Sequence, residues 1–477
     1  MTVSRRAALK YTLSATALAG LGTAAAPPKA SGDGLRSTTV NAKDYGASGD
    51  GTTDDTSAIH AARDAAGDGG KVLIPPGIYL VSGLTASVPD QTWRLSDGAV
   101  IKMKVGAANV LTVTGTGVSV VGGVFDCSNG TKNDGSQNGL LVKTEGISVK
   151  NVTVQNSPYC GISAYNHSRI TISGCTVRNS HFEGIFVQSW LAAPSNIYDI
   201  LITDNLVDNS LGGKYSAGIG VRGETDNQRV NRVTISRNTV RLPYDQSWET
   251  GAISVWNGDD WVVANNIVFG GFLGITCPNP TRAIISDNVV RGFSEIGIEI
   301  PGAVDNVTII RNRIDPDGTS ATSGIQASAG TVKDLRILEN FIKNFSTSCY
   351  LISFVTNEIS QQVTVARNIL ACADGSGSFT GVYFNGSVTG LTMSGNLVDG
   401  SSRANSWGVQ FLKSVSGASI NGNLFSNLAG AAVRLAASGH SYTLDHINVV
   451  GNSVVNCAAT LKDSTAGGAV VGTNIFT

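Results

Sequence analysis

Asparagine recurs along this chain at a nearly constant interval. Ten such residues are separated by 22 to 33 positions, and each lies in a short phrase flanked by apolar, often β-branched residues. They are Asn205, Asn238, Asn266, Asn288, Asn312, Asn340, Asn368, Asn396, Asn423 and Asn452. A fixed period of roughly 20 to 50 residues is typical of a solenoid, in which one supersecondary unit stacks on the next. Apolar pairs on both sides of a turn residue predict strand, bend and strand, so each unit is expected to be one coil of a parallel β-helix.

Asparagine suits such a bend for two reasons. It tolerates the left-handed backbone conformation that tight bends use, and its side chain can hydrogen-bond locally. When it is stacked on identical neighbours, its amide can also bond up and down a ladder. We therefore expect the repeated asparagines to take the bends of successive coils and to form one hydrogen-bonded ladder.

The composition agrees with an all-β protein that is rich in turns. The chain has 477 residues, of which 42% are hydrophobic and only 14% charged, and it contains 57 glycines. Because the core of a solenoid grows in one dimension, a chain of this length need not divide into globules, and we expect a single domain over residues 39–477. The seven cysteines include no CxxC pair and are interpreted as small apolar core residues.

Residues 1–30 are expected to be an export signal that is removed and takes no part in the fold. Arg5 and Arg6 precede an apolar run of small residues from Tyr11 to Ala26, and no acid occurs before Asp33. This segment resembles a twin-arginine signal, with an ordinary secretory signal as the alternative. Both predict a protein that is secreted or periplasmic. No later stretch is long and apolar enough to span a bilayer, so no membrane contact is expected of the mature chain.

The charge of the mature chain excludes one class of partner. Removing residues 1–30 takes away four cations and no acid, which leaves 30 basic and 35 acidic residues without basic runs. Such a surface argues against nucleic acid as a partner. A monomer or a homotrimer is the expected oligomeric state.

Residues 39–80 carry the most recognisable motif. Asp44-Tyr45-Gly46-Ala47-Ser48-Gly49-Asp50-Gly51 leads to an amphipathic helix that begins near Asp54 or Asp55, and Gly69-Gly70-Lys71-Val72-Leu73-Ile74-Pro75-Pro76-Gly77-Ile78-Tyr79 follows. The segment resembles the opening of the pectin-lyase-like superfamily, which implies a right-handed parallel β-helix with an N-terminal capping helix. Asp50, Asp54 and Asp55 are interpreted as helix-capping and turn-fixing acids. Because this opening accompanies several activities, it identifies the fold and not the reaction.

A second phrase, Gly-Ile-x-Val and its variants, predicts one long parallel sheet. In such a strand the Ile and the residue two positions later point inward, and the residue between them faces out. The outward positions of successive coils are Ser163, Phe186, Gly220, Ser254, Thr276, Glu299 and Gln326, followed along the strands by Tyr165, Gln188, Arg222, Trp256 and Pro278. An aromatic and polar strip suits sugar rings, which have apolar faces and hydroxyl edges. The expected sugar contacts are Tyr165, Gln188, Tyr215, Trp248, Trp256 and Glu299.

Carboxylates at coil spacing are the candidate catalytic groups. Adjacent coils stack at roughly 4.8 Å, so acids two coils apart approach the separation of roughly 6.5–9.5 Å used by inverting glycosidases. Glu249 is the first candidate because it lies beside Trp248, and its partner is expected to be Glu183 two coils earlier or Glu295 two coils later. Arg222 is predicted to hold a substrate hydroxyl or carboxylate, or to act as the base of a lyase.

Asn257-Gly258-Asp259-Asp260-Trp261 is similar to the G-D-D motif of polygalacturonase-type hydrolases, but its register differs. In that family the Asp pair opens the strand, whereas here it follows the predicted strand Ile253 to Val255. Ile298-Glu299-Ile300 stands where that family has R-x-K. Its catalytic roles are therefore not transferred, and Asp259 and Asp260 are kept as second-choice candidates. The W-x-D-H motif of calcium pectate lyases and the D-P-H-E motif of mannuronan epimerases are also missing.

These features predict a secreted enzyme that cleaves glycosidic bonds of a polysaccharide or oligosaccharide in a groove on the β-helix. Hydrolysis is favoured over β-elimination of the pectate lyase type. A non-catalytic carbohydrate-binding or surface protein is the alternative from another class. No metal site and no cofactor are predicted, except Ca²⁺ if the reaction is an elimination.

Overall fold

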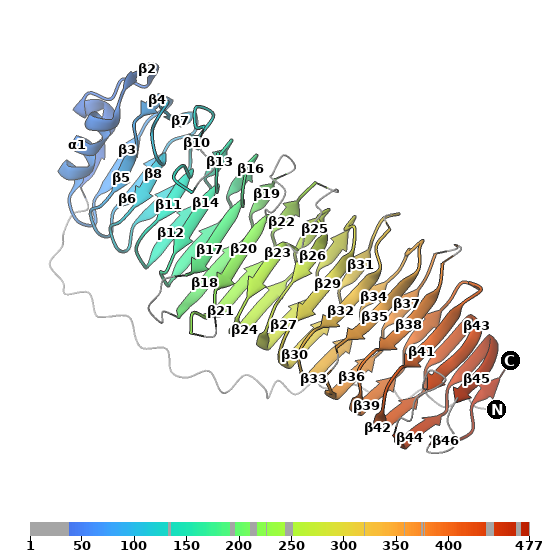
Figure 1. Ribbon diagram of the computed structural model, residues 1–477. Helices are drawn as coiled ribbons and strands as arrows, with labels where there is room; N and C mark the ends of the chain where they lie inside the picture. Colours follow the sequence, from blue (N-terminus) through green and yellow to red (C-terminus); the bar gives the residue numbers. More distant parts are fainter. Residues whose placement is uncertain are drawn as a thin grey trace, which may run out of the picture. The chain divides into compact units, whose positions relative to one another are not determined.

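The computed structural model describes residues 38–131, 135–190, 196–209, 217–225, 227–243, 251–318, 320–356, 358–373, 375, 377–435, 443–463 and 469–476. Within these ranges the chain forms one α-helix, one short 3-10 helix, and strands that pair in parallel in two sheets of 17 and 30 strands. Figure 1 shows the coils stacked one after another from the helix to the last strands. The fold expected from the sequence, a right-handed parallel β-helix with an N-terminal capping helix, is confirmed.

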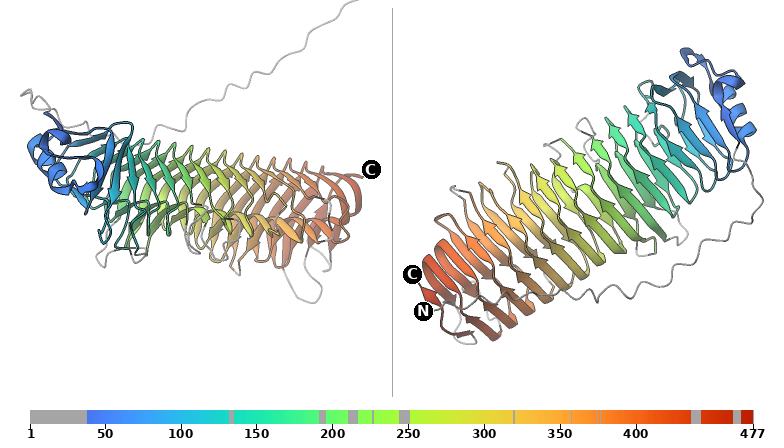
Figure 2. Two further views of the ribbon diagram at one scale, coloured as in Figure 1. Left: turned by 90° about the horizontal axis from the view of Figure 1, so that it is seen from above. Right: turned by 180° about the vertical axis from the view of Figure 1, so that it is seen from behind.

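Each complete coil of the central region contributes three strands. In one coil these are β18 (Ile197–Thr203), β19 (Leu206–Asp208) and β20 (Ile219–Gly223), and each pairs with its counterpart in the next coil, β21 (Val230–Ser236), β22 (Thr239–Arg241) and β23 (Gly251–Trp256). First strands form the 17-stranded sheet, and second and third strands together form the 30-stranded sheet. We call the pile of third strands the third stack. Figure 2 shows the coils from above and from behind.

The other first strands are β1 (Thr39–Asn41), β3 (Lys71–Ile74), β6 (Thr92–Leu95), β9 (Ser119–Val121), β12 (Ile147–Lys150), β15 (Ile170–Ser173), β24 (Gly258–Ala264), β27 (Pro280–Ser286), β30 (Val304–Ile310), β33 (Val332–Leu338), β36 (Ser360–Ala366), β39 (Val388–Ser394), β42 (Val415–Asn421), β44 (Leu444–Val450) and β46 (Ala469–Val471). The second strands are β2 (Asp50–Asp54), β4 (Gly77–Val81), β7 (Ala99–Met103), β10 (Val124–Asp126), β13 (Thr153–Gln155), β16 (Thr176–Arg178), β25 (Ile267–Phe269), β28 (Val289–Arg291), β31 (Arg313–Asp315), β34 (Phe341–Ile342), β37 (Ile369–Ala371), β40 (Leu397–Asp399) and β47 (Ile475–Phe476). The third stack also holds β5 (Leu84–Ala86), β8 (Leu111–Val113), β11 (Leu140–Val142), β14 (Ile162–Tyr165), β17 (Ile185–Ser189), β26 (Leu273–Thr276), β29 (Ile296–Pro301), β32 (Ser323–Ser328), β35 (Cys349–Val355), β38 (Phe379–Phe384) and β41 (Ser406–Phe411), and the long strands β43 (Leu424–Leu435) and β45 (Ser453–Asp463) continue from the second-strand position into it.

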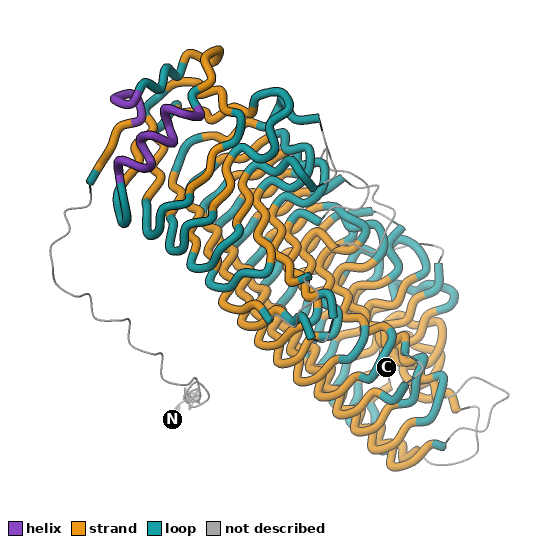
Figure 3. Tube along the Cα trace, turned by 60° about the vertical axis from the view of Figure 1, so that its left-hand side comes forward, coloured by secondary structure: helices purple, strands orange, loops and turns teal. Residues whose placement is uncertain are grey.

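The N-terminal end of the stack is covered by η1 (Ala42–Tyr45) and α1 (Thr56–Ala66), and Figure 3 shows these helices only at this end of the described chain. Asp54 accepts the Thr56 N–H at 3.1 Å at the start of α1, and Asp50 accepts the N–H groups of Thr52 and Thr53, both at 2.8 Å. Asp55 makes no cap bond to the helix, but its buried carboxylate accepts the Ser48 N–H at 2.6 Å. These three acids thus hold the cap together through hydrogen bonds.

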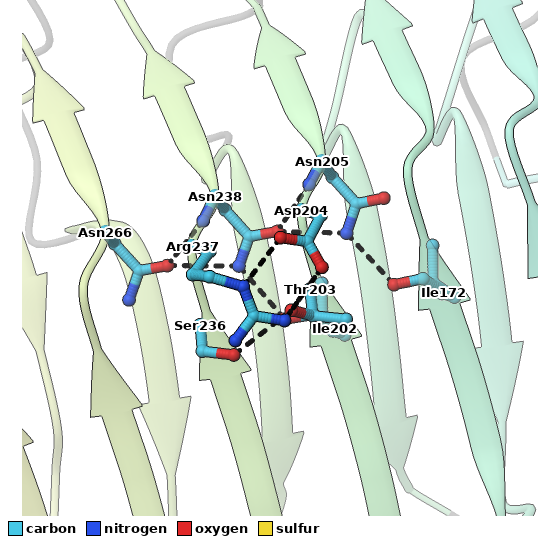
Figure 4. Close-up of polar contacts among 9 residues, drawn as sticks. All are labelled: Ile172, Ile202, Thr203, Asp204, Asn205, Ser236, Arg237, Asn238 and Asn266. Carbon is cyan, nitrogen blue, oxygen red and sulfur yellow. Dashed lines mark hydrogen bonds and ion pairs between the residues drawn. The ribbon is translucent and has the colours of Figure 1, made fainter.

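The repeated asparagines form the expected ladder. Asn205 Nδ2 donates to Asn238 Oδ1 at 2.9 Å and to the Ile172 carbonyl at 3.0 Å, and Asn238 Nδ2 donates in turn to Asn266 Oδ1 at 3.0 Å (Figure 4). The same pattern continues to Asn452, whose Nδ2 donates to Asn474 Oδ1 at 3.0 Å. Asn474 is an additional rung that the sequence analysis missed.

The expectation that these asparagines take the left-handed conformation was wrong. The residue before each of them takes it, as at Asp204 (φ 59°) and Arg237 (φ 56°). The division has a physical reason, because the asparagine must point into the core to bond buried carbonyls, while its neighbour points out. Arg237 Nε donates to Asp204 Oδ1 at 2.7 Å, so the outward column adds ion pairs between coils (Figure 4).

The strand register confirms the two predicted outward rows of the third stack. Ser163, Phe186, Gly220, Ser254, Thr276, Glu299 and Gln326 pair in that order from coil to coil, and so do Tyr165, Gln188, Arg222 and Trp256. Several outward side chains are nonetheless buried, among them Ser163, Phe186 and Ser254. All seven cysteines are buried free thiols, as the core interpretation requires. None of the helices described could cross a membrane, being too short or too polar.

Candidate functional site

Two hollows lie along the outward rows of the third stack. The first, here called the Glu299 hollow, has a volume of about 420 Å³, and the second, the Tyr165 hollow, about 380 Å³. The Glu299 hollow is lined by Trp256, Phe272, Leu273, Thr276, Pro278, Glu295, Ile296, Glu299, Pro301 and Ser328. The Tyr165 hollow is lined by Gly135, Tyr159, Tyr165, Gln188 and Trp190.

A buried ion pair stands between the two hollows. Arg222 Nη2 contacts Glu183 Oε1, and the Glu183 side chain is fully buried while that of Arg222 is 14% exposed. The guanidinium carbon lies 4.8 Å from the centre of the Trp256 ring and 5.3 Å from that of Phe186. Because Trp256 lines the Glu299 hollow and Gln188, the neighbour of Arg222 in register, lines the Tyr165 hollow, the pair links both.

Burial sets the acidity of Glu183. It raises the pKa of this carboxyl from 4.5 to about 7, although the charge of Arg222 and its hydrogen bond act in the opposite direction. A perturbed carboxyl beside a cation and two aromatic rings is a frequent feature of functional sites, and structural ion pairs share it.

Aromatic side chains surround the Tyr165 hollow. Tyr165 packs edge-on against Phe186 with ring centres 5.9 Å apart, and lies 6.3 Å from the ring of Trp190, which is 56% exposed. Burial raises the pKa of Tyr159 to about 12 and also raises that of Tyr165. Both phenols therefore keep their protons at neutral pH and can donate hydrogen bonds. Gln188, which lines the hollow, donates from Nε2 to Glu224 Oε1.

Two carboxylates share the Glu299 hollow. Glu295 accepts the hydroxyl of Thr322 at 2.7 Å, and Glu299 accepts that of Ser328 at 2.8 Å. Both donors come from the next coil, so each carboxylate is oriented by a neighbouring strand. The ring of Trp256 stands at the same hollow and donates from Nε1 to Ser254 Oγ at 2.6 Å. The hollow thus combines two oriented acids with an aromatic wall.

The structure brings together some of the predicted residues and separates others. Glu295, Glu299 and Trp256 share one hollow, and Tyr165 and Gln188 share the other, with Arg222 and Glu183 between them. Glu249, Trp248 and Tyr215 lie outside the described residues.

Glu183 and Glu295 do not lie at equivalent positions of their coils. The register aligns Ile185 with Ile219, Ile253, Ile275 and Ile298, which places Glu183 level with Ile296 and not with Glu295. The two acids are four strands apart, or roughly 19 Å at the usual strand spacing. They cannot act on one bond together.

Asp259 and Asp260 belong to the other sheet. They lie on the first strand β24, where Arg229 Nη2 donates to Asp259 Oδ1 at 2.6 Å and Arg282 Nε donates to Asp260 Oδ1 at 2.7 Å. These acids are parts of ion pairs between coils, and neither lines one of the two hollows. No group of three or more metal-binding side chains occurs within the part of the chain that the structure describes.

Sequence reasoning missed Tyr159 and the hydroxyl donors Thr322 and Ser328. Tyr159 directly precedes the Cys160-Gly161-Ile162 phrase, so its place at the start of a third strand was a usable signal. Ser328 lies on β32 in register with Pro301, two residues after Gln326, so the predicted outward row also pointed to it.

Two family models match the chain. The model described as rhamnogalacturonase A/epimerase, pectate lyase-like, matches residues 39–268, and the model of the right-handed β-helix region matches residues 251–425. Over these residues the chain is similar to pectate-lyase-like proteins and to right-handed β-helix regions. The two matches together span the cap, both hollows and most of the asparagine ladder.

Among known proteins, this β-helix protein is 24% identical over 392 residues to plasmin and fibronectin-binding protein A of Streptococcus pneumoniae, a match that covers 77% of this chain and 50% of the relative. The chain therefore spans half the length of that protein. Alginate lyase 7 of Azotobacter vinelandii is 62% identical over only 45 residues, which are 9% of this chain and 5% of the lyase. Among solved structures, a PL6 alginate lyase in complex with a trisaccharide has 15% identity and a TM-score of 0.47, with coverage of 82% of this chain and 86% of that chain.

Proposed function

We propose that this protein binds a polysaccharide along the outward rows of the third stack and hydrolyses a glycosidic bond in the Glu299 hollow. The observation that carries the proposal is the presence of Glu295 and Glu299 in one hollow beside the ring of Trp256. A two-carboxylate site with an aromatic wall has the parts of a glycosidase: two acids for proton transfer and an apolar surface for a sugar ring.

The positions of the two acids are compatible with the required separation. Glu299 lies on β29, Glu295 lies in the bend directly before this strand, and both residues line the hollow. Four residues span at most roughly 14 Å between Cα atoms, so two glutamate side chains at one hollow can bring their carboxyls to the roughly 6.5–9.5 Å that inversion needs. One carboxyl then protonates the leaving oxygen, and the other takes a proton from the attacking water.

The buried pair has a supporting role in this proposal. Glu183 holds Arg222, and the guanidinium of Arg222 lies against the ring of Trp256 at the wall of the hollow. The ring of Trp256 is thus held by its contact with the Arg222 guanidinium and by its hydrogen bond to Ser254. The exposed edge of Arg222 is available to bind a sugar hydroxyl.

β-Elimination is the second candidate, and the Tyr165 hollow supports it. Tyr159 and Tyr165 keep their protons, and Arg222 brings a cation close to them, which are groups that an elimination at a uronate can use. Ca²⁺ belongs to this alternative and not to the two-carboxylate mechanism. A binding protein without catalysis is the third candidate, because the relative matched over most of this chain is named for binding plasmin and fibronectin.

One assay on the purified mature protein separates the three candidates. New reducing ends without ultraviolet absorbance from an unsaturated sugar support hydrolysis, and new reducing ends with that absorbance indicate elimination. Retention on a polysaccharide without new ends indicates a binding protein.

Four variants then locate the site. If the Glu299 hollow is the active site, Glu295→Gln and Glu299→Gln each lose at least ~100-fold in rate with the fold intact, the usual contribution of an acid or base. Glu358→Gln is the matched control, because Glu358 also accepts a threonine hydroxyl, from Thr331, but lies between β35 and β36. A loss that appears only with Glu249→Gln would overturn this site in favour of the first candidate from the sequence.

We also propose that the chain is exported through its twin-arginine segment and acts outside the cytoplasm. Changing Arg5 and Arg6 together to Lys is expected to hold the precursor inside the cell. Normal secretion of this double variant would instead support an ordinary secretory signal.

A further inference from the structure

The outward rows continue well beyond the Glu299 hollow. The row that contains Glu299 runs on through Gln326, Ser353, Tyr383, Gln410 and Arg434, one residue for each coil. At the usual strand spacing Tyr383 lies roughly 14 Å from Glu299 along the stack, and Arg434 roughly 24 Å. A polymer that occupies the hollow and runs along the stack would pass over these residues.

Aromatic side chains gather on this continuation. Tyr350 and Tyr383 stack with ring centres 4.3 Å apart, and Tyr350 keeps 37% of its surface exposed. Two coils after Tyr350, in register with it through Thr380, lies Trp407. The guanidinium carbon of Arg434 lies 4.6 Å from the centre of the Trp407 ring.

Polar groups stand between the rings. Ser353 donates from its hydroxyl to Gln326 Oε1 at 3.2 Å. Gln326 pairs with Glu299 and Ser353 pairs with Tyr383, so this bond lies in the row between Glu299 and Tyr383. Gln410 and Arg434 follow in the same row, and both are half-buried. Rings for the apolar faces of sugars and amide or guanidinium groups for their hydroxyls are thus combined on one face.

We propose that Tyr350, Tyr383, Trp407 and Arg434 form a distal sugar-binding platform for the same polysaccharide chain whose bond lies in the Glu299 hollow. That the ligand is a carbohydrate polymer rests on the proposed function. One register row runs without interruption from Glu299 to Arg434, so the same polymer can reach both the hollow and the platform. The platform holds the chain at a distance from the reacting bond, so it acts on long chains and not on short ones.

Binding is measured first, because it needs no catalysis. The Glu299→Gln protein, the same protein with Tyr350→Ala and Tyr383→Ala, and the same protein with Trp407→Ala are compared by affinity electrophoresis in gels that contain the polysaccharide. We expect roughly tenfold weaker retention for the Trp407→Ala protein, the loss of about one aromatic contact, and a larger loss for the protein with both Tyr350→Ala and Tyr383→Ala. Tyr198→Ala is the matched control, because Arg232 lies 4.8 Å over the Tyr198 ring in the same kind of pair on the other sheet.

Kinetics give a second, independent readout. These measurements use the platform substitutions in protein that keeps Glu299. On the polymer they are expected to raise KM about tenfold and to leave kcat unchanged, while short oligosaccharides that fill only the hollow are cut as by the unchanged protein. Arg434→Gln keeps all three rings, so it tests the platform even where removal of a ring destabilises the coil. Unchanged retention and unchanged KM in folded variants would overturn the platform.

The outcomes separate the platform from the proposed reaction. If the polymer is cleaved and the platform variants behave like the unchanged protein, the platform proposal is wrong and the hydrolysis proposal is supported. If the polymer is retained but not cleaved, and the platform variants lose this retention, the hydrolysis proposal is wrong and the platform proposal is supported. If the platform variants lose as much activity on short oligosaccharides as on the polymer, these residues act through the stability of the fold, which also contradicts the proposal.

Discussion

The carboxylate of Glu183 lies directly over the α-carbon of Gly220. A methyl group on Gly220 would come within 2.1 Å of Glu183 Oε2. Gly220 is the neighbour of Phe186 in register, so the missing side chain leaves a space in the outward row that the carboxylate occupies. This space allows Glu183 to reach Arg222, which lies two residues further along the same strand.

Gly220→Ala is expected to destabilise the protein by about 1–3 kcal/mol, because overpacking must displace the buried carboxylate from Arg222. This cost is measured by urea unfolding of four proteins: the unchanged protein, Gly220→Ala, Glu183→Ala and the variant with both changes. Since the contact is the cause, Gly220→Ala should cost much less once Glu183 is Ala. Equal costs in both backgrounds would mean that Gly220 is needed for another reason.

Stability should depend on pH through Glu183. Its pKa is raised on folding from 4.5 to about 7, so the folded state holds the proton more tightly than the unfolded state. The stabilisation is full below the unfolded value and is lost as pH rises through the folded value, in total about 3 kcal/mol. The Glu183→Gln side chain has the shape of the protonated glutamic acid but does not titrate. The stability of the unchanged protein relative to this variant should therefore fall between pH 4 and pH 8, and a constant difference would contradict the raised pKa.

The fold could be predicted because its signals are local and repeated. The Gly-Ile phrase marks each third strand, and the asparagine phrase marks each bend, so both outward rows could be written in order from the sequence. The left-handed residue was misplaced by one position because asparagine fits both roles, and only the core-directed hydrogen bonds of Asn205 and its neighbours separate them. Asn474 was missed although it lies 22 residues after Asn452 and is followed by the apolar pair Ile475 and Phe476.

The candidate site could be predicted only in part. Arg222, Trp256 and Glu299 were placed correctly in the outward rows, since register fixes them. The contact of Glu183 with Arg222 needed a glycine at Gly220, and a sequence does not reveal which outward position is left empty to receive a side chain from the coil before. Glu295 lies one position before the level of Glu183, because Leu273 pairs with Ile296, and a shift of one residue reverses the face of a strand.

Arg403 should be one of the most sensitive cations in the described chain. It is fully buried, and its guanidinium donates to the carbonyls of Phe345 and Thr347, both at 2.5 Å, and of Ala373 at 2.8 Å. Arg403→Lys is expected to cost about 1–3 kcal/mol, because a lysine ammonium cannot reach all three carbonyls and leaves buried acceptors unpaired.

Thermal and urea unfolding measure this cost. Arg311→Lys is the control, since Arg311 forms an exposed pair with Asp287 at 2.7 Å, and such pairs contribute less than about 1 kcal/mol. Equal effects of the two changes would show that burial of Arg403 contributes nothing special.

The asparagine ladder should be weakest where it ends. Asn340 donates from its backbone N–H and from Nδ2 to Asn368 Oδ1, at 2.9 and 3.0 Å, and its own Oδ1 accepts the same pair of bonds from Asn312. Asn340→Leu should therefore cost about 1–3 kcal/mol, because buried donors and acceptors in both adjacent coils lose their partners. Asn474 is half-buried and contacts a ladder asparagine on one side, Asn452, so Asn474→Leu should cost less. Melting temperatures of the two variants decide the matter, and an Asn340→Leu protein that melts like the unchanged one would show that the ladder does not stabilise the fold.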